Sequence, residues 1–237
     1  MTKEEQILEK RFLELADTTY KKCIPLYTDF LTLYEQDIFL RLKTKLPPIY
    51  VSLDGAYPMA ERKMVCFFPD KESSYRNPPI KTIEISPVNA KFSDLLTHRD
   101  YLGALMNLGI ERAVLGDIVF DENSTFLFCK ENMVEYIIEN LCFIKHTNIS
   151  CKEVELVDHE FSIKYEEIKG SVATTRIDSV LSLAFAGSRS KLSAYITGKK
   201  VFVNSRLIES NSYMLKDNDI VSVRGLGKFV FKETVGL

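Results

Sequence analysis

Residues 187–208 read GSRSKLSAYITGKKVFVNSRLI. Ser188 is a favoured helix N-cap and Gly198 a favoured helix stop, so a short helix is predicted between them. Its apolar positions recur at i, i+3 and i+4, at Leu192, Tyr195 and Ile196. An Asn-led dipeptide then separates two β-prone triplets, which indicates a tight hairpin. The stretch therefore predicts a helix followed by a small antiparallel sheet.

The flanking sequence extends this unit in both directions. A second amphipathic helix is predicted upstream, because apolar residues recur at helical spacing: Ile177, Val180, Leu181, Ala184 and Phe185. Gly187 separates the two helices. Downstream, residues 216–219 read as a turn, and residues 220–224 and 229–231 read as two further strands. The C-terminal third is thus a small α+β domain.

Charge is distributed unevenly along the chain. Ten Lys/Arg and five Asp/Glu lie from residue 171 onward. The whole chain has 31 Lys/Arg and 33 Asp/Glu, which leaves 21 and 28 for residues 1–170. A basic end on an otherwise acidic chain indicates a polyanionic partner, most commonly a phosphate backbone. Arg189 and Lys191 fall in the first turn of a predicted helix, where free N–H groups and cations together bind phosphate.

The order of these residues resembles the RNA-binding domain named after small-subunit ribosomal protein S-four. The matching segments are Arg176-Ile177-Asp178, Ser188-Arg189-Ser190-Lys191, 196–204, Asp219-Ile220-Val221 and 224–229. The resemblance implies two helices and a small sheet that form an L-shaped basic surface for structured RNA. It places the RNA contacts on Arg176, Ser188, Arg189, Lys191, Lys199, Lys200, Asn204 and Arg206, with Arg224 and Lys228 as less specific matches.

Two positions depart from this family pattern. Ile177 stands where the family usually has Leu, and the apolar character of that helix position is kept. Ser205 stands where the family usually has Gly, which adopts positive φ at lower cost. Neither departure removes a cation from the predicted surface.

The N-terminal part is predicted to begin with a helical hairpin. Thr2 and Glu5 fit a capping box that opens the first helix, and apolar residues at helical spacing predict a second helix over residues 27–42. Residues 50–53 and 64–68 read as strands, and residues 69–79 read as a loop.

The middle of the chain shows an alternating pattern of strands and helices. Strands are predicted at 81–86, 113–120, 125–129 and 150–157, and helices at 94–108 and 133–143. The order βαββαβ is typical of a ferredoxin-like or RNA-recognition-like layer. No aromatic pair lies in an RNP-type context, and a shared fold alone is weak evidence for RNA contact.

One segment of this layer carries a second resemblance. Residues 91–112 read KFSDLLTHRDYLGALMNLGIER and residues 115–118 read LGDI, which is similar to the signature of YlmH-type bacterial proteins. This resemblance spans nearly the whole chain and implies an RNA-binding protein at the ribosome. It also implies that the protein binds rRNA or tRNA on large ribosomal subunits that carry stalled peptidyl-tRNA, as part of translation quality control.

Three polar residues of that signature form a possible secondary contact. His98, Arg99 and Asp100 are predicted to cluster at the start of a helix, where they could meet RNA or protein. Local capping and ion pairs within the domain explain the same residues equally well.

The fold class is therefore α+β in three parts: residues 1–79 (helical hairpin and short strands), 80–170 (ferredoxin-like) and 171–237 (S-four type). An apolar fraction of 46% with 27% charged residues is typical of a globular protein. The five cysteines lack a C-x-x-C pair and are expected to be reduced core thiols. No metal site and no cofactor are indicated. Without a long apolar segment, a soluble cytoplasmic protein is expected. The sequence does not determine the oligomeric state, and a monomer is favoured.

The sequence gives less support to an enzymatic function than to RNA binding. His98-Arg99-Asp100 matches the start of a kinase catalytic loop, but Leu105 stands where that loop needs Asn, and no glycine-rich phosphate loop is present. Arg176-Ile177-Asp178 resembles the catalytic context of pseudouridine synthases, yet it lies inside the predicted binding domain. We predict a non-catalytic protein with no catalytic residue. The alternatives are an RNA-modifying enzyme of the pseudouridine-synthase kind and an adaptor in which RNA binding is secondary.

Overall fold

The computed structural model describes residues 2–121, 124–156, 161 and 166–233. The chain divides into two compact units. One unit comprises Met1–Thr32 and Leu42–Lys164, and the other comprises Leu33–Arg41 and Tyr165–Leu237. The domain boundaries expected after residues 79 and 170 remain predictions, because the two compact units do not divide the chain into the same three parts.

The first helix, α1, spans Lys3–Lys22 and begins as predicted. Its capping box is complete, because the Glu5 amide donates to Thr2 Oγ1 at 3.2 Å and the Thr2 amide donates to Glu5 Oε2 at 2.8 Å. The helix ends at Cys23, whose φ of 54° is left-handed. Phe12 and Ala16 on its inner face are fully buried.

Residues 27–42 do not form one helix, which corrects the predicted extent of the second helix. Leu26–Tyr27 is a short strand, β1, and the helix α2 covers only Leu33–Leu42. β1 pairs with β3 (Met64–Phe68), which also pairs with β2 (Tyr50–Asp54). Sheet pairing therefore overrides the helical spacing of the first residues of this stretch.

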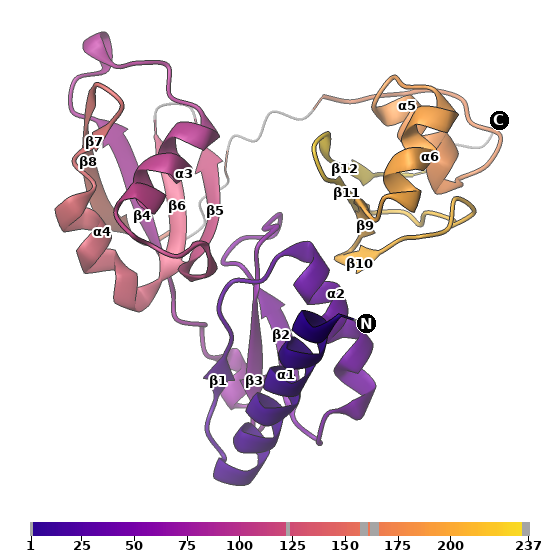
Figure 1. Ribbon diagram of the computed structural model, residues 1–237, viewed down its shortest axis with the longest axis horizontal. Coiled ribbons are helices and arrows are strands. Elements are labelled where there is room, and N and C mark those ends of the chain that lie inside the picture. The colour runs from indigo at the N-terminus through magenta and orange to yellow at the C-terminus, as the bar shows by residue number, and fades with distance from the viewer. Residues whose placement is uncertain (1, 122–123, 157–160, 162–165, 234–237) are drawn as a thin grey trace. The chain divides into compact units, whose positions relative to one another are not determined.

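The central layer confirms the predicted βαββαβ order. Its elements are β4 (Ile80–Pro87), α3 (His98–Asn107), β5 (Leu115–Phe120), β6 (Thr125–Lys130), α4 (Val134–Asn140), β7 (Phe143–Ile144) and β8 (Thr147–Val154). The strand order is β5-β6-β4-β8-β7, and every pairing is antiparallel. β7 is an additional short strand that forms a hairpin with β8. Figure 1 shows α3 and α4 on the central sheet.

The core of this layer lies between the sheet and its two helices. Ile83, Leu127 and Ile144 from the strands pack in one cluster with Leu105 of α3 and Ile137 of α4. Successive side chains of a strand point to opposite faces, so these residues define the helix-covered face of the sheet. Short 3₁₀ turns complete the unit at Lys43–Lys45, Ser73–Tyr75, Ala90–Phe92, Arg112–Val114 and Glu131–Met133.

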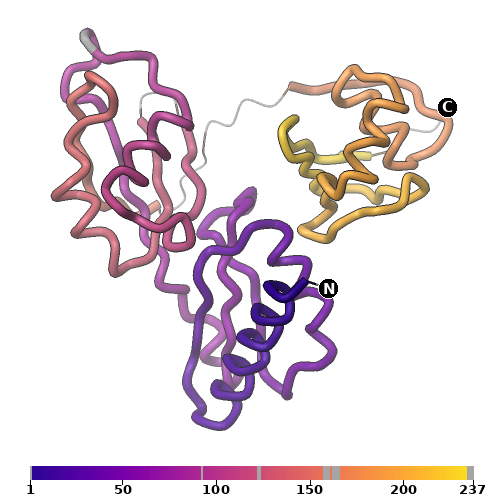
Figure 2. Tube along the Cα trace, in the orientation of Figure 1, coloured from indigo at the N-terminus to yellow at the C-terminus, as the bar shows by residue number. Residues whose placement is uncertain are grey.

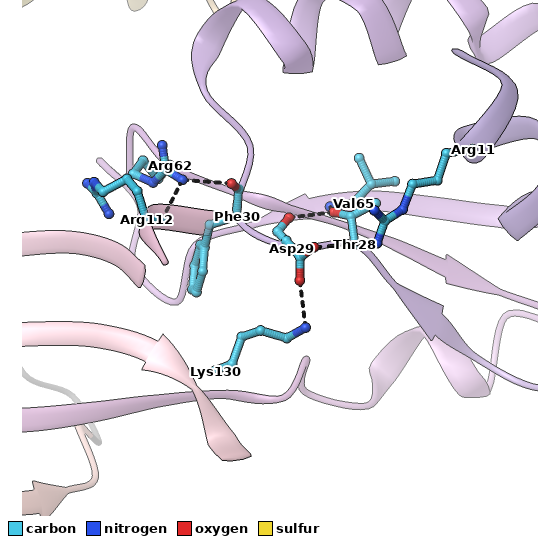
Figure 3. Close-up of polar contacts among 8 residues, drawn as sticks. All are labelled: Arg11, Thr28, Asp29, Phe30, Arg62, Val65, Arg112 and Lys130. Carbon is cyan, nitrogen blue, oxygen red and sulfur yellow. Dashed lines mark hydrogen bonds and ion pairs between the residues drawn. The ribbon is translucent and has the colours of Figure 1, made fainter. Parts of the chain in front are cut away.

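Polar contacts join the N-terminal segment to the central layer (Figure 3). Asp29 pairs with Lys130 of β6 at 2.7 Å and with Arg11 of α1 at 3.4 Å. The Arg62 guanidinium donates to the carbonyl oxygens of Phe30 and Arg112, at 2.8 and 3.0 Å. The Arg62 contacts give two backbone carbonyl oxygens a hydrogen-bond donor.

The C-terminal part has the predicted helices and sheet. Its elements are α5 (Ile177–Ala184), α6 (Arg189–Thr197), β9 (Val201–Val203), β10 (Arg206–Leu207), β11 (Asp219–Val223) and β12 (Gly227–Phe231). The strand order is β10-β9-β11-β12. The trace in Figure 2 shows α5 and α6 side by side. Leu181, Leu192 and Val221 are among the buried residues that join the helices to the sheet.

The cysteines only partly match the expectation of core thiols. Cys66 and Cys129 are buried and Cys151 is half-buried, whereas Cys23 and Cys142 are exposed. Burial raises the pKa of the Cys66, Cys129 and Cys151 thiols to about 12. Among the described residues, no group of His, Cys, Asp or Glu side chains could hold a metal ion, and no helix is long and apolar enough to cross a bilayer.

Candidate nucleic-acid interface

The start of α6 is the best-formed anion site among the predicted contacts. Ser188 is its N-cap, and the Ser188 Oγ accepts from the Lys191 amide at 3.4 Å. Arg189 and Lys191 are exposed, and neither forms an ion pair within the described part of the chain. Free N–H groups and two cations at a helix N-terminus suit a phosphate oxygen.

Arg176 is the N-cap residue of α5. Its guanidinium makes a two-point contact with the Asp178 carboxylate, with Nε–Oδ1 at 3.0 Å and Nη2–Oδ2 at 3.1 Å. The Arg176 hydrogen bonds lower the pKa of Asp178, and the charge of Arg189 contributes a smaller effect in the same direction. Asp178 thus orients the Arg176 guanidinium.

Lys199 and Lys200 follow α6. Lys199 has a left-handed φ of 56°, and its Nζ lies 3.0 Å from Glu209 Oε1. Both side chains of this pair are more than half exposed, so the ion pair is weak and can yield to a phosphate. The Lys200 Nζ lies 5.5 Å from the centroid of the Tyr195 ring, at cation–π distance.

Asn204 has a structural task in the hairpin between β9 and β10. Its Nδ2 donates to Asp219 Oδ1 at 2.8 Å, and its Oδ1 accepts from the Ile220 amide at 3.0 Å. Asn204 and Ser205 have φ values of 48° and 67°, the signature of a type I′ turn. Because its amide ties the turn to β11, we leave Asn204 out of the proposed contact set.

The remaining predicted cations lie on the small sheet. Arg206 is exposed on β10 and makes no ion pair with the described residues. The Arg224 guanidinium carbon lies 5.3 Å from the Phe202 ring centroid, and the Arg224 amide donates to the Lys200 carbonyl at 2.9 Å. Arg224 is therefore a neighbour of Lys200. Lys228 is exposed on β12.

The cluster at the start of α3 is largely explained by local structure. Asp100 Oδ2 accepts from the Thr97 amide and hydroxyl at 2.8 and 2.7 Å, and it pairs with Lys145 at 2.8 Å. These contacts, with Lys145 first, lower the pKa of Asp100 to about 2. Partial burial and the nearby Arg112 lower the pKa of His98. Arg99 is exposed and unpaired within the described ranges.

Sequence reasoning missed three side chains that position the cations. Asp178 was assigned to a helix, Tyr195 to the apolar face of a helix and Phe202 to a strand, yet each contacts a predicted cation. The spacing of Asp178, two residues after Arg176 at a helix start, could have indicated the ion pair. The aromatic contacts depend on tertiary packing and leave no local signal.

Two family models match the chain. Residues 77–158 match the model described as "Putative RNA-binding domain in YlmH", and residues 175–221 match the S4 domain. The central layer and the basic C-terminal domain therefore define a bacterial-type RNA-binding protein with a C-terminal S4 domain, as the sequence predicted.

The curated relative identifies the family. The ribosome-associated protein quality control protein P2 of Bacillus subtilis (strain 168) is 30% identical over 205 residues, which cover 85% of this chain and 78% of that protein. The chain belongs to the YlmH family. A solved structure, the cell division protein ylmH from Streptococcus pneumoniae, has the same fold with a TM-score of 0.51. It is 23% identical, and the match covers 66% of this chain and 94% of that one.

Proposed function

We propose that this protein is a non-catalytic RNA-binding protein that acts at the ribosome in the cytoplasm. It binds rRNA or tRNA on large subunits during translation quality control. The observation that carries the proposal is the N-terminus of α6, where Ser188 is the cap and the exposed Arg189 and Lys191 form no ion pair with the described residues. The Bacillus relative is named as a ribosome-associated quality control protein, which supports a role at the ribosome.

The chemistry of this surface is electrostatic. Arg189, Lys191 and the first amides of α6 would hold phosphate oxygens, while Asp178 keeps the Arg176 fork in a fixed orientation. Such contacts position the protein on folded RNA and carry little sequence information.

The geometry of Asp178 disfavours the pseudouridine-synthase alternative. The carboxylate is 8% exposed at the residue level and is engaged by Arg176 through both oxygens. A catalytic Asp must reach the substrate with a free oxygen. Asp178 therefore has an orienting role in our proposal.

The test compares an Arg189→Ala/Lys191→Ala double variant with the wild-type chain. Binding to purified large ribosomal subunits and to tRNA is measured across a salt series. Each lost phosphate contact lowers the slope of log affinity against log salt by about 1 unit, so the double variant should lose about 2 units. Its thermal unfolding should match the wild type, because both side chains are exposed.

A matched control is Lys43→Ala/Lys45→Ala. These two exposed cations have the same spacing but lie in the other unit. The control should bind both ligands with the wild-type salt dependence. Equal losses in both double variants, or an affinity that does not change with salt, would contradict the proposal.

A further inference from the structure

The central sheet has one face that the helices leave uncovered. The cluster beneath α3 and α4 contains Ile83, Leu127 and Ile144, so the neighbouring strand residues point the other way. The middle of this second face is occupied by aromatic rings. Phe128 of β6 stacks on Tyr57 at a centroid distance of 5.0 Å, and Phe161 lies 5.4 Å from Phe126.

The edge of the same face is exposed. Phe143 of β7 is opposite Asn148 of β8, and the Val88 amide donates to the Asn148 carbonyl at 2.9 Å, which continues the β4–β8 register. Directly paired residues share a face, so Val88, Asn148 and Phe143 form a row across three strands. Phe143 is 62% exposed and Val88 is 67% exposed.

Polar groups surround this row. Ser86 and Ser150 are the next pair along β4 and β8, followed by Glu84 and Lys152. Glu84 accepts from the Ser124 hydroxyl at 2.6 Å and pairs with Lys152 at 2.9 Å, so its negative charge is compensated. The Asn148 amide forms no side-chain hydrogen bond with the described residues and can both donate and accept.

The geometry points to a binding site for an unpaired nucleobase on this edge, with the base stacked on Phe143 and its polar edge facing Asn148. This site is a second RNA contact, separate from the S4 domain, and it rests on the proposed RNA-binding function. RNA modules of this kind stack bases on aromatic side chains of the sheet. Here the middle of the face is filled by Tyr57 and Phe161, and the exposed aromatic ring lies at the edge.

A nucleobase fits the edge better than a protein surface does. A protein hot spot needs a contiguous apolar patch, whereas here a polar amide separates Val88 from Phe143 and two hydroxyls border them. One aromatic ring beside an amide matches the size and polarity of a single base. The family model for an RNA-binding domain spans residues 77–158, which include the entire row.

The absence of tryptophan from the chain makes a direct test possible. A Phe143→Trp variant of the full chain is titrated with a synthetic RNA stem–loop and with a blunt duplex of the same stem. Base stacking should quench the fluorescence of this one tryptophan with the stem–loop and not with the duplex. Met106→Trp, an exposed position on α3, is the control and should stay unquenched with both RNAs.

Affinity measurements complete the test. Phe143→Ala should weaken stem–loop binding by about fivefold or more, with less than about a twofold change for the duplex, and Phe143→Tyr should retain affinity. The inference is overturned if the stem–loop does not quench the tryptophan of Phe143→Trp and Phe143→Ala binds the stem–loop as the wild type does. In that case Arg189→Ala/Lys191→Ala would still lose affinity for the RNA, and the proposed function would stand. It is equally overturned if Phe143→Ala weakens binding to a protein partner and leaves the affinity for RNA unchanged. Failure of the wild type to bind either RNA would overturn the proposed function as well.

Discussion

Asp178 and Asn204 show how single polar residues organise the S4 domain. Both lie among predicted RNA contacts, and both use their side chains within the domain: Asp178 on Arg176, and Asn204 on Asp219 and the Ile220 amide. The family resemblance placed an RNA contact on Asn204, which stays a prediction, and it did not indicate that both side chains form hydrogen bonds within the domain. The partners lie up to 16 residues away, and only folding brings them together.

Asp100 gives a prediction at the same scale. Its hydrogen bonds to Lys145 and Thr97 lower its pKa to about 2 in the folded state, below the ordinary value near 3.8. A carboxylate with a lowered folded-state pKa stabilises the protein above its unfolded-state pKa and loses that contribution as pH falls through the folded value. Unfolding by urea should therefore show a loss of stability between about pH 4 and pH 2 that is smaller in Asp100→Asn.

The matched control for this experiment is Asp17→Asn. Asp17 forms an exposed ion pair with Lys21 on α1 and shows a side-chain exposure of 53%, against 15% for Asp100. Its substitution should leave the acid profile nearly unchanged. An identical acid profile for wild type and Asp100→Asn would show that the capping contact is not maintained in solution.

The hairpin between β9 and β10 illustrates the scale of single elements. Local sequence predicted a tight turn, and the structure forms one with positive φ at both central residues. Helix α2 shows the opposite case. The apolar spacing over residues 27–42 predicted a helix, yet pairing of Leu26 and Tyr27 with β3 delays the helix start until Leu33. Short-range signals decide turns and caps, whereas strand pairing depends on a partner far along the chain.

Ser205 yields a prediction for this element. Its φ of 67° is costly for a residue with a side chain, so Ser205→Gly should stabilise the protein by about 0.5–1 kcal/mol. Thermal and denaturant unfolding measure the effect. Ser193→Gly makes the same chemical change inside α6 and should destabilise by about 0.5–1 kcal/mol. A destabilising Ser205→Gly substitution would contradict the assigned turn.

At the scale of the whole molecule, each unit buries its own core. One cluster joins the central sheet to α3 and α4, and another joins α5 and α6 to the small sheet. The second unit also includes residues 33–41, where the Asp37 carboxylate accepts from the Leu207 amide at 3.1 Å. Residues 171–237, most of which belong to this unit, carry an excess of positive charge, and residues 1–170 carry an excess of negative charge.

Thiol labelling tests the packing of the whole chain. In the native protein, Cys23 and Cys142 should react rapidly with a thiol reagent, Cys151 slowly, and Cys66 and Cys129 only after unfolding. Burial raises the pKa of the three slow thiols and withdraws them from solvent. All five should react in denaturant. Cys23→Ser/Cys142→Ser should abolish the fast phase; fast native labelling of Cys66 would contradict the fold.

Spacing, local backbone preference and composition were enough to predict the βαββαβ layer, the two helices of the basic domain, the Ser188 cap and the uneven charge. Only the folded structure shows which polar side chains of the C-terminal domain form contacts within it, as Asp178 and Asn204 do. It also shows that α2 starts only at Leu33 and that Phe143 lies exposed at the edge of the sheet face that α3 and α4 do not cover. These features depend on contacts between residues that are distant in the sequence. The free energy of such contacts exceeds that of local helix or strand propensity, and the contacts produce no periodic pattern in the sequence.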